Sequence, residues 1–72
     1  MKSQSVQIIL WKEGKYFVAE CLNNNISSFG ESKKEALENI HEALELYFEN
    51  EPEYVLQVVE QVEIFQSSIS YA

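Results

Sequence analysis

The distribution of apolar residues divides the chain into two kinds of segment. Between residues 5 and 29 they alternate with polar residues or form short runs rich in β-branched and aromatic side chains, which is typical of strands. Between residues 32 and 50 they recur every three or four positions, which is typical of a helix with one apolar face. Strand-like composition returns at 57–66. The pattern therefore predicts an α+β fold with the order β-β-β-α-β.

Three short strands are expected before the helix. The first two, 5–11 and 16–22, should form an antiparallel hairpin, because Gly14 between them can adopt a positive φ. The three asparagines at 23–25 predict a loop, since asparagine tolerates the left-handed region and hydrogen-bonds its own backbone. A third strand is expected at 26–29, with Gly30 ending it.

The helix should begin and end at recognisable residues. Ser32 and Glu35 match a capping box, in which the serine oxygen accepts from the amide of Glu35 and the Glu35 side chain reaches back. Pro52 should end the helix near residue 50, because a residue that precedes proline disfavours the helical region. The apolar stripe comprises Ala36, Leu37, Ile40, Ala43, Leu44, Tyr47 and Phe48. A fourth strand is expected within 57–66, followed by a tail at about 67–72.

The chain of 72 residues has room for one domain, predicted to span 1–72. A core of this size is marginal without disulfides, metal or oligomerisation. Its single cysteine, Cys21, excludes an internal disulfide, so we expect a homodimer or a higher homo-oligomer. Trp11, Tyr16 and Phe17 flank the first turn and are either ordinary exposed aromatics or part of a subunit contact.

Two further features bear on the compartment. The apolar run near the start of the chain is too short for a signal sequence or a membrane span. A lone cysteine, Cys21, suits a reducing environment. We therefore expect a cytoplasmic protein that has no contact with membranes.

The negative charge is concentrated in one part of the chain. The formal net charge is −7, from 12 acidic and 5 basic residues, and neither aspartate nor arginine occurs. Most of the glutamates lie in 31–53, where Lys33 and Lys34 are the basic residues. Nucleic-acid binding requires a basic surface, so we expect no direct contact with DNA or RNA.

Five of these glutamates follow helical spacing and form what we call the acidic face. Its members are Glu35, Glu38, Glu42, Glu45 and Glu49. At about 100° per residue they lie opposite the apolar stripe. A charge run of this kind is usually a solvated helix face. A face that only stabilised the helix would alternate negative and positive side chains, however. In addition, glutamates near the helix C-terminus interact unfavourably with the helix dipole. The alternative is therefore a docking surface for a basic partner.

Catalytic and metal-binding patterns are weak. Glu38 and His41 have the Glu-x-x-His spacing of di-iron bundles, but a single copy is more simply a histidine at the edge of the apolar stripe. Cys21 with His41 could be imagined as nucleophile and base, although Cys21 shares a strand face with apolar residues and is expected to be buried. Carboxylates on expected strands are few: Glu20, Glu60 and Glu63. We expect no enzymatic activity, no metal and no cofactor.

Several fixed spacings within 16–49 resemble the HicB antitoxin family. The family's helix reads roughly Glu-Ala-x-x-Asn-x-x-Glu-Ala-Leu-x-x-Tyr, with Ser/Thr-x-Gly-x-Ser/Thr upstream and a strand ending Val-Ala-x-Cys. The matching residues are Glu35, Ala36, Asn39, Glu42, Ala43, Leu44, Tyr47, Ser28, Gly30, Ser32, Val18, Ala19 and Cys21. The chain departs from the family at 22–25, where a Pro-x-Leu-Pro-Gly stretch is usual and Asn25 stands in place of the glycine.

The resemblance implies a truncated ribonuclease-H-like fold that assembles into dimers or larger oligomers. It also implies that the chain binds and occludes HicA, a small basic toxin that cleaves mRNA. Many family members carry a C-terminal DNA-binding domain, whereas this sequence ends after the fourth expected strand, so operator binding by this polypeptide alone is not expected. The alternatives are an oligomeric adaptor of the same fold with no toxin partner and, less in keeping with the residues, a small-ligand or metal-binding module.

Overall fold

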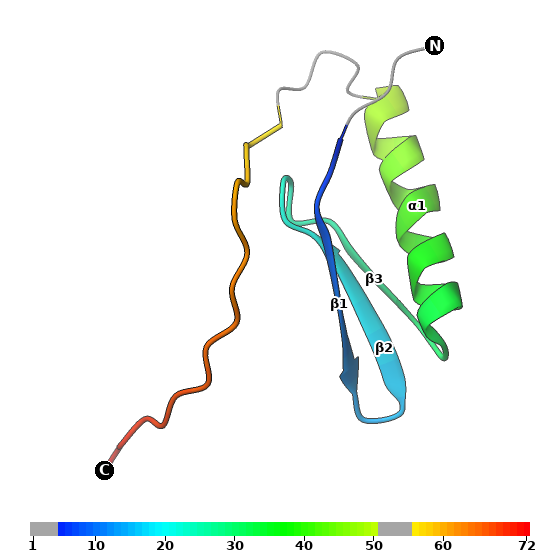
Figure 1. The fold of residues 1–72 in the computed structure, drawn as a ribbon. Helices are drawn as coiled ribbons and strands as arrows, with labels where there is room; N and C mark the ends of the chain where they lie inside the picture. Colours follow the sequence, from blue (N-terminus) through cyan, green and yellow to red (C-terminus); the bar gives the residue numbers. More distant parts are fainter. Residues whose placement is uncertain (1–4, 51–55) are drawn as a thin grey trace.

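The computed structural model describes residues 5–50 and 56–72 of the chain. It contains strands β1 (Ile8–Glu13), β2 (Tyr16–Cys21) and β3 (Ser27–Gly30), followed by helix α1 (Lys33–Asn50) (Figure 1). The strands form one antiparallel sheet in the order β1-β2-β3. This arrangement confirms the α+β class, the three strands before the helix and the position of the helix itself.

The hairpin between β1 and β2 closes through a two-residue loop that is shorter than expected, because the first strand runs over Ile8–Glu13 and not over the predicted 5–11. Glu13 pairs with Tyr16, and Gly14 between them has φ of 62°. A positive φ at the first central residue is what a type II′ hairpin turn requires, and glycine adopts it without steric cost. Asn25 also has a positive φ, 63°, so the asparagine loop contains the left-handed residue that its composition predicted.

Helix α1 covers one face of the sheet, and the core lies between them (Figure 1). The buried core consists of Ala19, Cys21, Ala36, Ile40 and Leu44. Half-buried apolar side chains pack around it, three of them from β1 and the residues before it: Val6, Ile8 and Leu10. The prediction that Cys21 is a buried thiol is confirmed.

The N-terminus of α1 is capped by a side chain. The Ser32 hydroxyl accepts a hydrogen bond from the Glu35 amide at 3.1 Å, and the first helical backbone bond runs from Ala36 N to Ser32 O. The reciprocal half of the capping box is displaced by one residue, because the Glu35 carboxylate accepts from the amide of Glu31 at 3.3 Å. The predicted start of the helix is therefore confirmed, with a modified cap.

Replacing Ser32 with alanine should lower the free energy of unfolding by about 1 kcal/mol, because the Glu35 amide loses its intramolecular acceptor. Chemical denaturation monitored by far-UV circular dichroism would measure the loss. The control is Ser68→Ala, since Ser68 is exposed and lies outside any helix or strand. Equal effects of the two substitutions would contradict the capping role of Ser32.

Gly30 has a role that differs from the predicted one. It is the last residue of β3 and is buried, so it belongs to the strand. A Cβ atom at this position would lie 2.6 Å from the backbone nitrogen of Ala36 and 2.9 Å from the carbonyl carbon of Glu35. The absence of a side chain at Gly30 allows the first turn of α1 to approach the end of β3.

The fourth strand predicted at 57–66 is not formed in this structure. Residues 56–72 are extended but carry no strand pairing, and the tail expected at 67–72 continues in the same way (Figure 1). Strand propensity favours an extended backbone, but a strand also needs a neighbour for its hydrogen bonds, and segment 56–72 has none among the described residues. Pro52, the predicted helix stop, lies outside the described residues.

Candidate functional site

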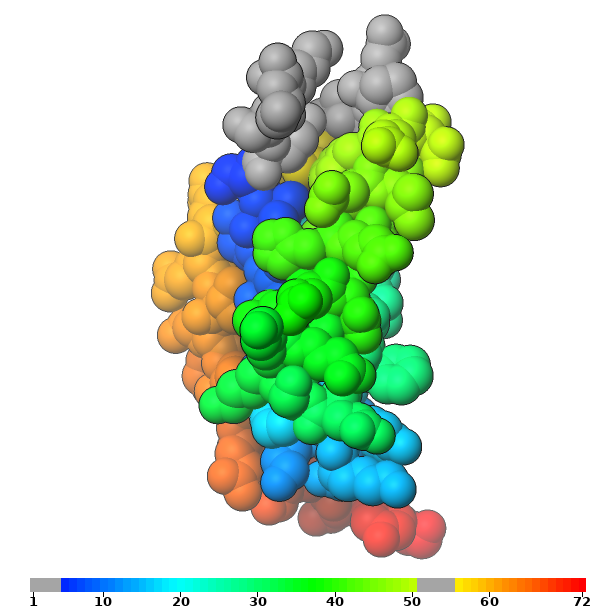
Figure 2. Space-filling view, turned by 90° about the vertical axis from the view of Figure 1, so that its right-hand side faces the viewer, coloured from blue at the N-terminus to red at the C-terminus, as the bar shows by residue number. Residues whose placement is uncertain are grey.

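The acidic face occupies the side of α1 that points away from the sheet. All five of its glutamates are exposed, whereas the buried residues of α1, Ala36, Ile40 and Leu44, contact the core. Figure 2 views the molecule from the α1 side, and no other described segment covers the helix in this view. From Glu35 to Glu49 the acidic face extends about 21 Å along the helix. The prediction that these residues share one exposed face is confirmed.

The charges of the acidic face lack basic partners within the described part of the chain. Lys33 and Lys34 form no ion pair there, so the possible pairing of Lys34 with Glu38 is not made. Glu35 lies in the first turn, where the helix dipole favours a carboxylate, but the last turn contains no basic residue and does contain Glu49. Most of the acidic face therefore does nothing for the stability of α1.

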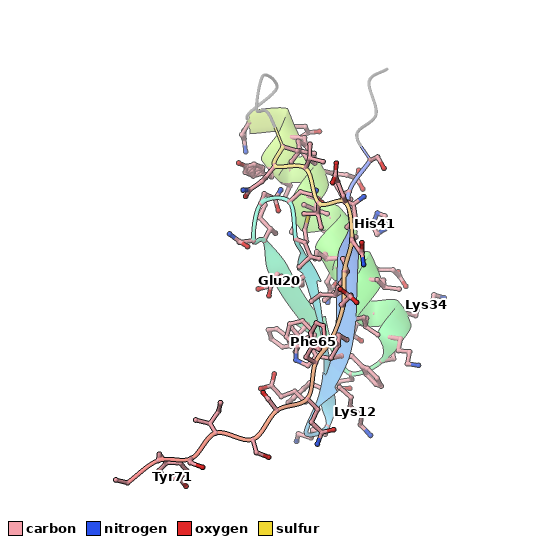
Figure 3. All side chains as sticks on the ribbon, turned by 60° about the vertical axis from the view of Figure 1, so that its left-hand side comes forward. Lys12, Glu20, Lys34, His41, Phe65 and Tyr71 are labelled. Carbon is pink, nitrogen blue, oxygen red and sulfur yellow. The ribbon has the colours of Figure 1, made fainter. Side chains whose placement is uncertain are left out.

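The residues considered for catalysis or metal binding are not brought together. Cys21 is buried under α1, while His41 is exposed on α1 itself. His41 and Glu20 point in opposite directions (Figure 3). Glu60 and Glu63 are exposed on segment 56–72. No group of three or more metal-ligating side chains forms within residues 5–50 and 56–72.

A second surface, which the sequence pattern did not reveal, lies on the sheet face that α1 leaves uncovered. The Tyr16 and Phe29 rings meet edge to face there, with centroids 5.9 Å apart, although the two residues are on different strands. Together with Val18 they help to line a shallow hollow of about 440 Å³. Phe29 is 64 % exposed. This surface arises from the pairing of β2 with β3, which no single stretch of sequence shows.

The aromatic residues around the first turn are divided between the two faces of the sheet. Phe17 packs against the core, whereas Trp11 and Tyr16 lie on the other face and are exposed. The latter two are therefore placed to contact another molecule: Tyr16 lines the hollow, and Trp11 pairs across the sheet with Val18, which also lines it.

A buried asparagine, Asn23, was also missed as a structural residue. Its side-chain carbonyl accepts from the amide of Gln7 at 2.8 Å, and its Nδ2 donates to the Gln7 side chain at 2.9 Å and to the Gln57 carbonyl at 2.8 Å. Asn23 thereby joins three distant parts of the chain. Its place among three asparagines indicated a loop and gave no signal for this bridging role.

Comparisons with known proteins identify no relative. No protein-family model, no curated protein and no solved structure matches the chain. A separate feature concerns membranes: α1, the helix of the described residues, lacks the hydropathy of a transmembrane span.

Proposed function

We propose that this protein is a cytoplasmic HicB-like antitoxin that binds and occludes a small basic HicA-like toxin through the acidic face. The observation that carries the proposal is an exposed helix surface with five glutamates and no basic partner among the described residues. The spacings shared with the HicB family lie on the same helix and on the strands beneath it. The proposal includes the truncated ribonuclease-H-like arrangement of that family, and it assigns the protein no catalytic role.

The acidic face would act on a basic partner through long-range electrostatic attraction. Clustered like charges raise the rate at which an oppositely charged protein associates, by ten- to a thousandfold at low ionic strength. They also disfavour partners of the same sign. A basic ribonuclease presents positive charge where it contacts RNA, so a 21 Å line of carboxylates can cover that surface and compete with the phosphate backbone.

An oligomeric adaptor of the same fold is the second candidate, and the uncovered aromatic surface around Tyr16 and Phe29 favours it. An adaptor would use this apolar surface and would tolerate changes on the acidic face. The two candidates differ in genomic context, because an antitoxin is expected beside an open reading frame for a small basic protein.

The triple substitution Glu38→Gln, Glu42→Gln and Glu45→Gln should weaken binding to the product of such a neighbouring gene. We expect the association rate at low salt to fall about tenfold or more, because three of the five steering charges are lost. The slope of affinity against salt concentration should fall as well. Surface plasmon resonance at several ionic strengths measures both quantities.

The matched control removes the same charge elsewhere, through Glu13→Gln, Glu20→Gln and Glu31→Gln. These residues lie outside α1, so the control changes the net charge equally and leaves the acidic face intact. If both triple variants bind alike, net charge alone governs association. If the acidic-face variant keeps the affinity and salt dependence of the wild type, the proposal fails.

A further inference from the structure

Segment 56–72 contains more of the exposed large apolar side chains than the other described residues together. Six of its large apolar side chains are 46–93 % exposed: Val58, Val62, Ile64, Phe65, Ile69 and Tyr71. Beyond Gln57, none of its residues forms a hydrogen bond with another described residue. Figure 3 shows Tyr71 well beyond the sheet. The radius of gyration is 14.6 Å, against about 11 Å for a compact chain of this length.

The sheet has two edges, and only one of them is open. The β3 edge is occupied by α1, because Asn39 on the helix donates a hydrogen bond from Nδ2 to the Phe29 carbonyl at 2.9 Å. The β1 edge lies away from α1 (Figure 1). Gln7 uses its carbonyl to accept from Leu22 N, so its backbone faces β2. Because this orientation alternates along an antiparallel strand, the backbone groups of Ile8, Leu10 and Lys12 face outward.

The first four residues of β1 lack the charges and prolines that usually prevent strand addition, and charge appears only at Lys12 and Glu13. The strand begins with Ile8, Ile9 and Leu10. Ile8 and Leu10 lie on the helix side of the sheet, while Ile9 and Trp11 lie on the other side. An added strand would therefore meet apolar neighbours on both of its faces.

Segment 56–72 matches this edge in pattern and in charge. Val58, Val62 and Ile64 share one side of an extended chain, and Val59 and Phe65 share the other. The segment carries Glu60 and Glu63 and no basic residue, whereas β1 and the turn that follows it carry two lysines, Lys12 and Lys15, against one glutamate, Glu13.

We propose that segment 56–72 of one copy adds as a strand to the β1 edge of a second copy, and that the exchange is reciprocal. The hydrogen bond from Asn23 to the Gln57 carbonyl holds the base of the segment to its own domain, and the residues beyond it reach the second copy. Each copy supplies one unpaired strand and one unpaired edge. A two-fold dimer therefore pairs both strands with both edges. Phe65 and Tyr71 of the two copies make four exchanged aromatic side chains. If each buries roughly 150–250 Å², they supply about half of the buried area of a standard stable interface.

The first test measures the molar mass of the full-length chain by light scattering coupled to gel filtration. The wild type should be a dimer at micromolar concentration. The double substitution Val62→Pro and Glu63→Pro should raise the dimer dissociation constant about tenfold or more. Adjacent amides point to opposite edges of a strand, so this pair removes a ladder donor whichever side is used. The control, Val62→Ile with Glu63→Thr, keeps strand-forming residues at the same positions and should remain dimeric.

The second test uses complementation. Lys12→Pro removes an outward-facing amide from the receiving edge and should also give a monomer, with circular dichroism used to check that it remains folded. A mixture of Lys12→Pro with the double-proline variant contains one intact strand and one intact edge, so it should form a heterodimer. A monomeric wild type would overturn the proposal, as would a double-proline variant that dimerises like the wild type. A monomer in which amides 58–66 resist hydrogen exchange would show instead that the segment folds onto its own sheet.

Discussion

Replacing Gly30 with alanine should lower the free energy of unfolding by about 1–3 kcal/mol, because the new methyl group has no space. The nearest atoms to its Cβ would be Ala36 N at 2.6 Å and the carbonyl carbon of Glu35 at 2.9 Å. Both are backbone atoms of the first turn of α1, so no side chain can move aside to relieve the contact. Helix and strand would have to separate, and the core contacts of Ala36 would be loosened.

Urea denaturation of the Gly30→Ala variant measures this loss. The matched control is Ser27→Thr, which also adds one methyl group to β3 but at an exposed position. The control should change stability by less than about 0.5 kcal/mol, since exposed substitutions away from special contacts are nearly neutral. If alanine at position 30 is equally well tolerated, the close approach of α1 to β3 is not what requires glycine.

The parts of the fold that the sequence predicted are those determined by local pattern. The spacing of Ala36, Ile40 and Leu44 sets the buried face of α1 over 18 residues, and Ser32 sets its first turn. The hairpin follows from Gly14 between two alternating segments. The acidic face was predictable for the same reason, because the residues opposite an apolar stripe are exposed wherever the helix packs.

The features that the sequence did not reveal depend on contacts between distant segments. The hollow beside Tyr16 and Phe29 exists because the register of β2 and β3 brings the two rings together. The role of Gly30 depends on where α1 returns against the sheet. Segment 56–72 has the composition of a strand, yet composition cannot specify the neighbour that a strand requires.

The distribution of exposed groups gives the molecule two separate surfaces for two kinds of contact. The acidic face lies on the outer side of α1, and the open edge of β1 lies away from that helix (Figure 1). A dimer formed through β1 would leave both acidic faces accessible. Dimerisation by strand exchange and binding of a basic partner are therefore compatible, and the variants proposed for one leave the surface of the other unchanged.

Replacing Asn23 with alanine should lower the free energy of unfolding by about 2–4 kcal/mol. Asn23 is 4 % exposed, and its amide group connects the Gln7 backbone and side chain with the Gln57 carbonyl. Loss of this group leaves the Gln7 amide without an acceptor in a partly buried position, which costs about 1–3 kcal/mol, and further hydrogen bonds are lost with it. The substitution also releases the base of segment 56–72.

Two further substitutions separate these contributions. Asn23→Asp keeps an acceptor for the Gln7 amide but places a buried carboxylate oxygen opposite the carbonyl oxygens of Gln7 and Gln57, so it should be at least as destabilising as Asn23→Ala. Asn25→Gly is the loop control, because Asn25 is exposed with φ of 63° and glycine adopts that conformation freely. Denaturation gives the stabilities, and hydrogen exchange at the Gln7 amide reports its protection. If Asn23→Ala is no less stable than Asn25→Gly, the network around Asn23 does not hold β1, the loop and segment 56–72 together.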